Sequence, residues 1–128
     1  MPARYRIDSA RRLVVQNIFG VVQLNEMLAM LASLRQDPDF DPDFDVLADL
    51  SAMSATEITF QATSQAVSSG VLNPFSNISR CAVVAPGDLA FGMARMYEAI
   101  RKGGEFEIFR SMADAEAWLA EGQAAEAS

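Results

Sequence analysis

The sequence contains no histidine, only one cysteine and no long apolar run, and each absence excludes a class of protein. Without histidine there is no side chain that normally titrates near neutral pH, no Ser-His-Asp or Cys-His nucleophile and no usual zinc ligand. The single cysteine, Cys81, excludes an internal disulfide. The longest apolar run, residues 27–32, is far shorter than the roughly 20 residues that span a bilayer.

Positive charge is also scarce, because 17 acidic residues outnumber 10 basic ones and give a formal charge of -7 and a pI of about 4.4. Non-specific binding to nucleic acid requires a basic face, so we expect no nucleic-acid partner. The basic residues Arg4 and Arg6 are followed by no apolar stretch that resembles a signal peptide. We therefore expect a cytoplasmic protein without an integral membrane segment.

The chain does have enough apolar residues for one folded domain. Of its 128 residues, 51% are hydrophobic and 21% are charged, and the mean hydropathy is +0.11. These values are typical of a globular domain with a substantial core. We expect one domain over residues 1–121, followed by a flexible polar tail over residues 122–128.

The spacing of apolar residues predicts alternating strands and helices. Period-2 alternation and short apolar runs predict strands, and apolar residues at i, i+3, i+4 and i+7 predict helices. The expected strands cover residues 4–8, 11–19, 46–50, 80–85 and 106–109; the expected helices cover residues 24–34, 54–68 and 89–100, with a last helix from Ser111 onward. The order ββαβαβαβα predicts a single α/β domain. Its sheet of about five strands is expected to be mixed and mostly parallel, antiparallel at the first strand, with helices packed on it.

The acidic loop 37–45 invites comparison with a calcium site, because aspartates occupy the first, third and fifth positions of an EF-hand pattern. The rest of the pattern fails, since Pro42 stands where glycine is needed and Ala48 where a bidentate glutamate is needed. We therefore expect no bound metal and no cofactor. The loop is interpreted as a solvated turn that Phe40 and Phe44 anchor to the core.

Two other features suggest chemistry but are better explained by packing. Cys81 lies in an apolar strand with no histidine to lower its pKa, so we expect a buried, unreactive thiol. Met93, Met96 and Tyr97 could face a ligand, but their spacing is that of an ordinary apolar stripe on a helix, and we interpret them as core.

The segment 49–56 is the most informative for function. It places hydroxyl groups after a strand and at an expected helix start, where Ser54 and Glu57 form a capping box. Free backbone N–H groups at a helix N-terminus stabilise phosphate and other anions. The candidate anion or partner site consists of Asp49, Ser51, Ser54 and Thr56.

Several segments between Arg4 and Ala120 form a combination that is typical of one family. They are the opening hairpin with Gly20, the Asp-Pro-x-Phe-x-Pro-x-Phe loop 37–44 leading to Asp-Leu-Ser at 49–51, Ala-Val-Val-Ala at 82–85, Phe-Gly-Met-Ala-Arg-Met-Tyr at 91–97, and Phe-Arg at 109–110 with Ala-Trp-Leu at 117–119. In these segments the chain resembles the uncharacterised branch of the SpoIIAA-like, or STAS-like, group of small bacterial proteins. The resemblance implies a fold shared with anti-sigma-factor antagonists and, more distantly, with the CRAL-TRIO lipid-transfer domain.

The resemblance also implies where a phosphorylation site would lie. In the antagonists the strand ending in Asp-Leu-Ser leads to a helix that starts Asp-Ser-Ser-Gly, where a partner kinase phosphorylates a serine. The corresponding residues here are Ser54, Ala55, Thr56 and Glu57, so only Thr56 keeps an acceptor hydroxyl. Glu57 would oppose a phosphate beside it.

Two non-enzymatic functions follow from these observations, with an enzyme ranked third. The first is a regulatory module that docks an unknown protein partner around Ser51, Ser54 and Thr56, with or without phosphorylation. The second is a binder of a small apolar or amphipathic, lipid-like ligand between the helices. The candidate ligand pocket consists of Phe60, Val67, Leu72, Phe75 and Phe91. The sequence leaves a homodimer open and names no catalytic residue.

Overall fold

The computed structural model describes residues 3–70, 73–101 and 103–127 and shows an α/β fold. The strands are β1 (Ala3–Asp8), β2 (Leu13–Val22), β3 (Asp45–Thr56), β4 (Arg80–Val84) and β5 (Glu105–Phe109); the helices are α1 (Leu24–Gln36), α2 (Phe60–Ser69), α3 (Asp88–Ile100) and α4 (Met112–Ala127). The predicted order ββαβαβαβα is confirmed. None of the described helices is long and apolar enough to cross a membrane.

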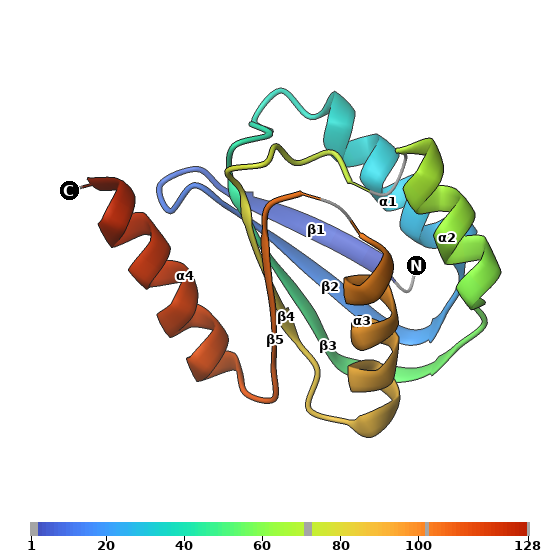
Figure 1. The fold of residues 1–128 in the computed structure, drawn as a ribbon. Helices are drawn as coiled ribbons and strands as arrows, with labels where there is room; N and C mark the ends of the chain where they lie inside the picture. Colours follow the sequence, from blue (N-terminus) through green and yellow to red (C-terminus); the bar gives the residue numbers. More distant parts are fainter. Residues whose placement is uncertain (1–2, 71–72, 102, 128) are drawn as a thin grey trace.

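The five strands form one mixed sheet in which the spatial order follows the chain, from β1 to β5. β1 is antiparallel to β2, and the other neighbouring pairs are parallel, as the sequence predicts. Each connection between two parallel strands leads to the neighbouring strand, and all of them progress toward the same edge of the sheet. Because such crossovers are right-handed, they place α1, α2 and α3 on one face of the sheet (Figure 1).

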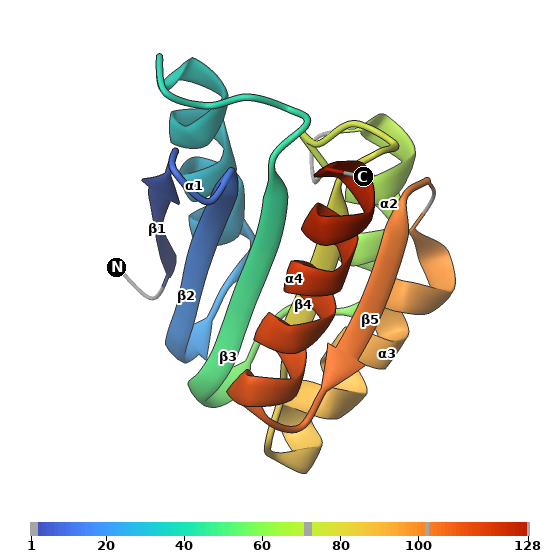
Figure 2. The same cartoon turned by 90° about the vertical axis from the view of Figure 1, so that its left-hand side faces the viewer.

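The helix α4 follows β5 and packs on the opposite face, over β3, β4 and β5 (Figure 2). Successive residues of a strand point to opposite faces, so β2 contributes Val14 and Ile18 to the core under α1–α3 and Leu13 and Val15 to the core under α4. The inner strands are therefore buried on both faces, and three helices cover one face of the sheet.

The acidic loop 37–45 is held by its two phenylalanines. Phe44 is buried in the core, and the ring of Phe40 packs edge-on against Phe75 with 5.5 Å between ring centroids. The carboxylates of Asp37 and Asp41 each accept the backbone N–H two residues further on. The predicted turn with two aromatic anchors is confirmed.

The predicted helix start at Ser54 is wrong. Ser54 is an exposed residue of β3, so it forms no capping box with Glu57. The helix α2 begins six residues later, at Phe60, where the hydroxyl of Thr59 accepts the N–H of Ala62 at 3.1 Å. Gly70, in the left-handed conformation, ends it as expected.

The reason for this difference is the length of the neighbouring strand. β2 continues to Val22, and it pairs with β3 to the last residue, with Val22 opposite Thr56. The pairing includes two irregularities, between Asn17 and Phe19 and between Gly20 and Val21. Hydrogen bonds to β2 thus keep residues 51–56 extended although their own sequence permits a helix start.

The predicted tail also differs, because α4 continues past residue 121 to Ala127. Gly122 is buried, in contact with the side chain of Arg80. The side-chain amide of Gln123 donates to the carbonyl of Arg11 at 2.5 Å. Residues 122 and 123 therefore belong to the packed domain and not to a tail.

Candidate functional site

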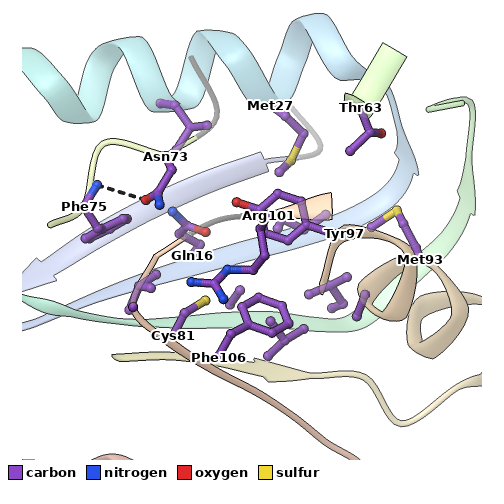
Figure 3. Close-up of a pocket in the computed structure, with 18 of the residues that line it drawn as sticks. Gln16, Met27, Thr63, Asn73, Phe75, Cys81, Met93, Tyr97, Arg101 and Phe106 are labelled. Carbon is purple, nitrogen blue, oxygen red and sulfur yellow. Dashed lines mark hydrogen bonds between the residues drawn. The ribbon is translucent and has the colours of Figure 1, made fainter. Parts of the chain in front are cut away.

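A cavity of about 150 Å³ lies between the sheet and the helices α1, α2 and α3 (Figure 3). Its floor comes from inward-facing residues of four adjacent strands. Two rows of paired residues form most of that floor: Val46, Cys81 and Phe106 in one, and Gln16, Ala48 and Val83 in the other. The register of the parallel strands thus fixes which side chains face the cavity.

Small side chains explain why this space is not filled. Ala48 on the floor and Ala94 on α3 both line the cavity, and Thr63 is the residue of α2 that faces it. Protein interiors normally pack without voids of this size, so an empty cavity forfeits dispersion contacts. A cavity of this volume with apolar walls is large enough to hold a molecule the size of benzene.

The cavity has a polar end and an apolar end. Most of its polar side chains come from the segments that lead into β4 and β5, namely Asn73, Ser76, Ser79 and Arg101, and Gly103 and Gly104 line the same end. Leu24 and Ile58, which follow β2 and β3, line the opposite end. Because Asn73, Gly103 and Gly104 are exposed, the cavity reaches the surface at its polar end.

Two polar side chains on the cavity wall lack hydrogen-bond partners in the described chain, and the buried atom without a partner is the hydroxyl oxygen of Ser76. Gln16 is 7% exposed, and its side chain makes no hydrogen bond with the part of the chain that the structure describes. The hydroxyl oxygen of Ser76 is buried and likewise has no partner among the described residues. An unsatisfied buried polar group costs free energy, which a bound polar group would recover.

Arg101 is the single cation among the described lining residues. Its guanidinium lies over the ring of Phe106, with 4.8 Å to the centroid, and donates to the carbonyl of Gly103. It forms no ion pair with a carboxylate in the described ranges. Figure 3 shows its side chain pointing into the same part of the cavity as Gln16 and Cys81. Most of its five N–H donors are left for another acceptor.

Two side chains on the wall can lose a proton, the Cys81 thiol and the Tyr97 phenol, and both are neutral at pH 7. Burial raises the pKa of Cys81 from 9.0 to about 12, and nearby Asp45 adds to this effect while Arg101 opposes it. Burial also raises the pKa of Tyr97 from 10.0 to about 12. Since no aspartate or glutamate lines the described wall, Arg101 carries its only formal charge.

Of the predicted pocket residues that the structure describes, Phe75 lines the cavity, whereas Phe60, Val67 and Phe91 do not. Phe60 is 57% exposed, and the ring of Phe91 is covered by the guanidinium of Arg110 at 3.8 Å from its centroid. Val67 is partly buried but outside the lining, and Leu72 falls outside the described residues. Phe60, Val67 and Phe91 lie outside the lining because apolar character alone could not place α2, which starts at Phe60.

Three residues that the sequence pattern predicts as core also line the wall of the cavity. Met93, Met96 and Tyr97 line the cavity, although Met93 and Tyr97 also pack against the core. The pattern showed correctly that this stripe of α3 faces inward. It could not show that the opposing side chains are too short to meet it.

The predicted anion site loses the helix start on which it depended. Asp49, Ser51, Ser54 and Thr56 all lie on β3, and no helix begins beside them. The Asp49 carboxylate accepts both the N–H and the hydroxyl of Ser51, and the Thr56 hydroxyl accepts the N–H of Ile58 at 3.1 Å. A protein partner at this surface stays a prediction.

The residues that could hold a metal are not gathered. Within the described ranges, no three cysteine, aspartate or glutamate side chains come close enough together to ligate one ion. The polar residues that line the cavity instead include Gln16, Ser76 and Arg101, which were missing from the predicted pocket. One signal was present in the sequence, because Gln16 and Asn17 are polar residues between the apolar residues 13–15 and 18–19 of a predicted strand.

The comparisons with known proteins concern the fold. No protein-family model matches the sequence, and no curated protein matches it. A similar solved structure is that of an uncharacterised protein of the DUF3478 family from Shewanella loihica PV-4, which has a SpoIIAA-like fold. It superposes with a TM-score of 0.61 and 19% sequence identity, over 91% of this chain and 93% of that one. This chain therefore has a SpoIIAA-like fold, as its resemblance to that group implies.

Proposed function

We propose that this protein binds a small, mainly apolar molecule in the cavity under α1, α2 and α3. The observation that carries the proposal is a cavity of about 150 Å³ that combines apolar walls with a few unpartnered polar groups at one end. Small-molecule sites typically have this composition, in which the apolar surface supplies affinity and the polar groups fix orientation.

The properties of the wall favour binding over catalysis. General acid–base catalysis works best with a group whose pKa is close to the operating pH, whereas Cys81 and Tyr97 stay protonated far above neutrality. Three methionines line the cavity, Met27, Met93 and Met96. Their flexible side chains can adapt to ligands of different outline.

Nuclear magnetic resonance of methyl-labelled methionines tests the proposal. Adding 1-hexanol should shift the methyl signals of Met27, Met93 and Met96 in a saturable manner. The signal of Met112, the first residue of α4, should stay in place because Met112 packs on the other face of the sheet. Absence of any saturable shift up to the solubility limit of the alcohol would contradict the proposal.

A cavity-filling substitution supplies the control. Ala94→Leu should occupy the space and abolish the hexanol shifts, because Ala94 is buried and lines the cavity. Ala99→Leu makes the same change on an exposed position of α3 and should leave binding intact. Equal effects of the two substitutions would show that hexanol binds elsewhere.

A further inference from the structure

We infer that the polar end of the cavity is a subsite for one carboxylate group, so that the ligand is a small monocarboxylic acid with an apolar body. This inference rests on the proposed function and names the class of ligand. It is carried by three side chains at the cavity wall: the Arg101 guanidinium, the amide of Gln16 and the hydroxyl of Ser76.

The burial of these groups indicates that an acceptor is missing. Gln16 is more than nine-tenths buried, has no hydrogen-bond partner within the described chain and points into the cavity (Figure 3). The Ser76 hydroxyl oxygen is a buried atom without a partner among the described residues. Arg101 lacks a carboxylate partner in the same part of the molecule, and its contacts with Phe106 and Gly103 hold the guanidinium in place.

The set of donors fits a carboxylate better than other polar groups. A guanidinium presents two parallel N–H donors that match the two oxygens of a carboxylate, and the amide and hydroxyl can donate to the remaining lone pairs. A phosphate dianion would need more positive charge than the single arginine supplies. A neutral alcohol would leave the charge of Arg101 without a partner.

The position of the three groups also fixes the orientation of the ligand. Ser76 and Arg101 lie at the end of the cavity that reaches the surface, and Met27, Leu24 and Ile58 extend away from it. The carboxylate would therefore lie at the mouth and the apolar body inside. Because the protein carries a net charge of -7, its overall field repels anions, and recognition must come from these local donors.

Comparing hexanoate with hexanamide tests the inference, since the two have the same outline and differ in charge. Titrations followed by the methionine methyl signals at pH 7 should give a dissociation constant about 10- to 100-fold lower for hexanoate, the range that charge-assisted hydrogen bonds usually supply. Equal affinities, or tighter binding of hexanamide, would overturn the inference. If 1-hexanol binds while hexanoate does not, the inference fails and the proposed function stands; if none of the three binds, both fail.

Two substitutions with the same change in net charge locate the subsite. Arg101→Gln should remove the preference for hexanoate over hexanamide, whereas Arg95→Gln, at an exposed arginine of α3 that pairs with Glu98, should preserve it. A preference that survives Arg101→Gln would overturn the inference. Should that variant fail to fold, Gln16→Leu provides the second test and should reduce the preference several-fold without weakening the binding of 1-hexanol.

Discussion

At the scale of single residues, Thr59 sets the start of α2 by accepting the N–H of Ala62. Removing an N-cap hydroxyl usually costs about 1 kcal/mol of folding free energy, so Thr59→Ala should lower the free energy of unfolding by about that amount. Ser54, which the sequence pattern favoured for this role, is exposed and lies in β3. Urea denaturation of Ser54→Ala should therefore give a midpoint close to that of the unmodified protein. The reverse order of the two midpoints would mean that α2 starts where the capping box suggested.

Ser54 lies in a strand for a physical reason that its local sequence does not contain. A capping box is a local pattern, and Ser54 and Glu57 satisfy it. The extended conformation of β3 is imposed instead by β2, which is more than thirty residues away in sequence and pairs with β3 as far as Thr56. Local propensity gives way where a neighbouring strand is long enough to continue the sheet.

At the scale of elements, the side chain of Arg80 links α4 to the strands β4 and β5. The Arg80 guanidinium lies 4.4 Å from the centroid of the Trp118 ring, donates to the Trp118 carbonyl at 2.7 Å and pairs with Glu105. Gly122 on α4 lies directly against this side chain, and a Cβ atom there would overlap it. Glycine is usually unfavourable in a helix interior, but the packing between α4 and β4 requires it at position 122.

This contact predicts opposite effects for the same substitution in two helices. Gly92→Ala on α3 meets no neighbouring atom and should stabilise the protein by roughly 0.5–1 kcal/mol, the usual gain in helix propensity. Gly122→Ala should instead destabilise it by about 1 kcal/mol or more, because Arg80 is held by three interactions and cannot easily move away. Thermal denaturation of both variants measures the difference. In an Arg80→Ala background Gly122→Ala should become neutral or stabilising, and a loss that persists there would contradict this explanation.

The elements that the sequence predicts best are those whose apolar pattern is strong. Leu24, Met27 and Leu31 mark one face of α1, and the helix forms there almost as expected. The apolar run around Val83 likewise forms an internal strand that is covered on both faces. The weakly patterned residues 54–56 and 122–123 differ from the prediction, since residues 54–56 pair with β2, Gly122 contacts Arg80 and Gln123 donates to the carbonyl of Arg11.

At the scale of the whole molecule, the right-handed crossovers place three helices over one face of the sheet, and the cavity lies beneath them (Figure 1). The sequence shows which residues face inward, as it does for Met93 and Tyr97. It cannot show that Ala48 and Ala94 leave space between the layers, because a cavity arises from side chains that fail to meet across the fold. The fold was therefore predictable in outline, whereas the site required the structure.

The Cys81 thiol and the Tyr97 phenol on the cavity wall should make the stability of the whole molecule fall at alkaline pH. The pKa values of Cys81 and Tyr97 rise from 9.0 and 10.0 to about 12 in the folded protein, mainly through burial. Between pH 9 and 12 the folded state therefore holds more protons than the unfolded state, and stability falls as pH rises through this window. The pKa of Tyr5 is also raised, by partial burial and by its hydrogen bond to Asp37, and acts in the same direction.

The substitution Tyr97→Phe separates this effect from general charge repulsion. The Tyr97 hydroxyl makes no hydrogen bond with the described residues, and phenylalanine keeps the ring contact with Phe106, whose centroid lies 5.7 Å away. The variant should match the unmodified protein at pH 8 and lose less stability between pH 10 and 12. Urea denaturation at a series of pH values measures the slope of the unfolding free energy against pH for each protein.

Tyr5→Phe should also flatten the slope but start from a lower stability at pH 8, because it loses the hydrogen bond to Asp37. Parallel slopes for Tyr97→Phe and the unmodified protein would contradict this prediction. They would mean that Tyr97 ionises as easily in the cavity as in the unfolded chain. The cavity would then be wetter than its apolar walls indicate.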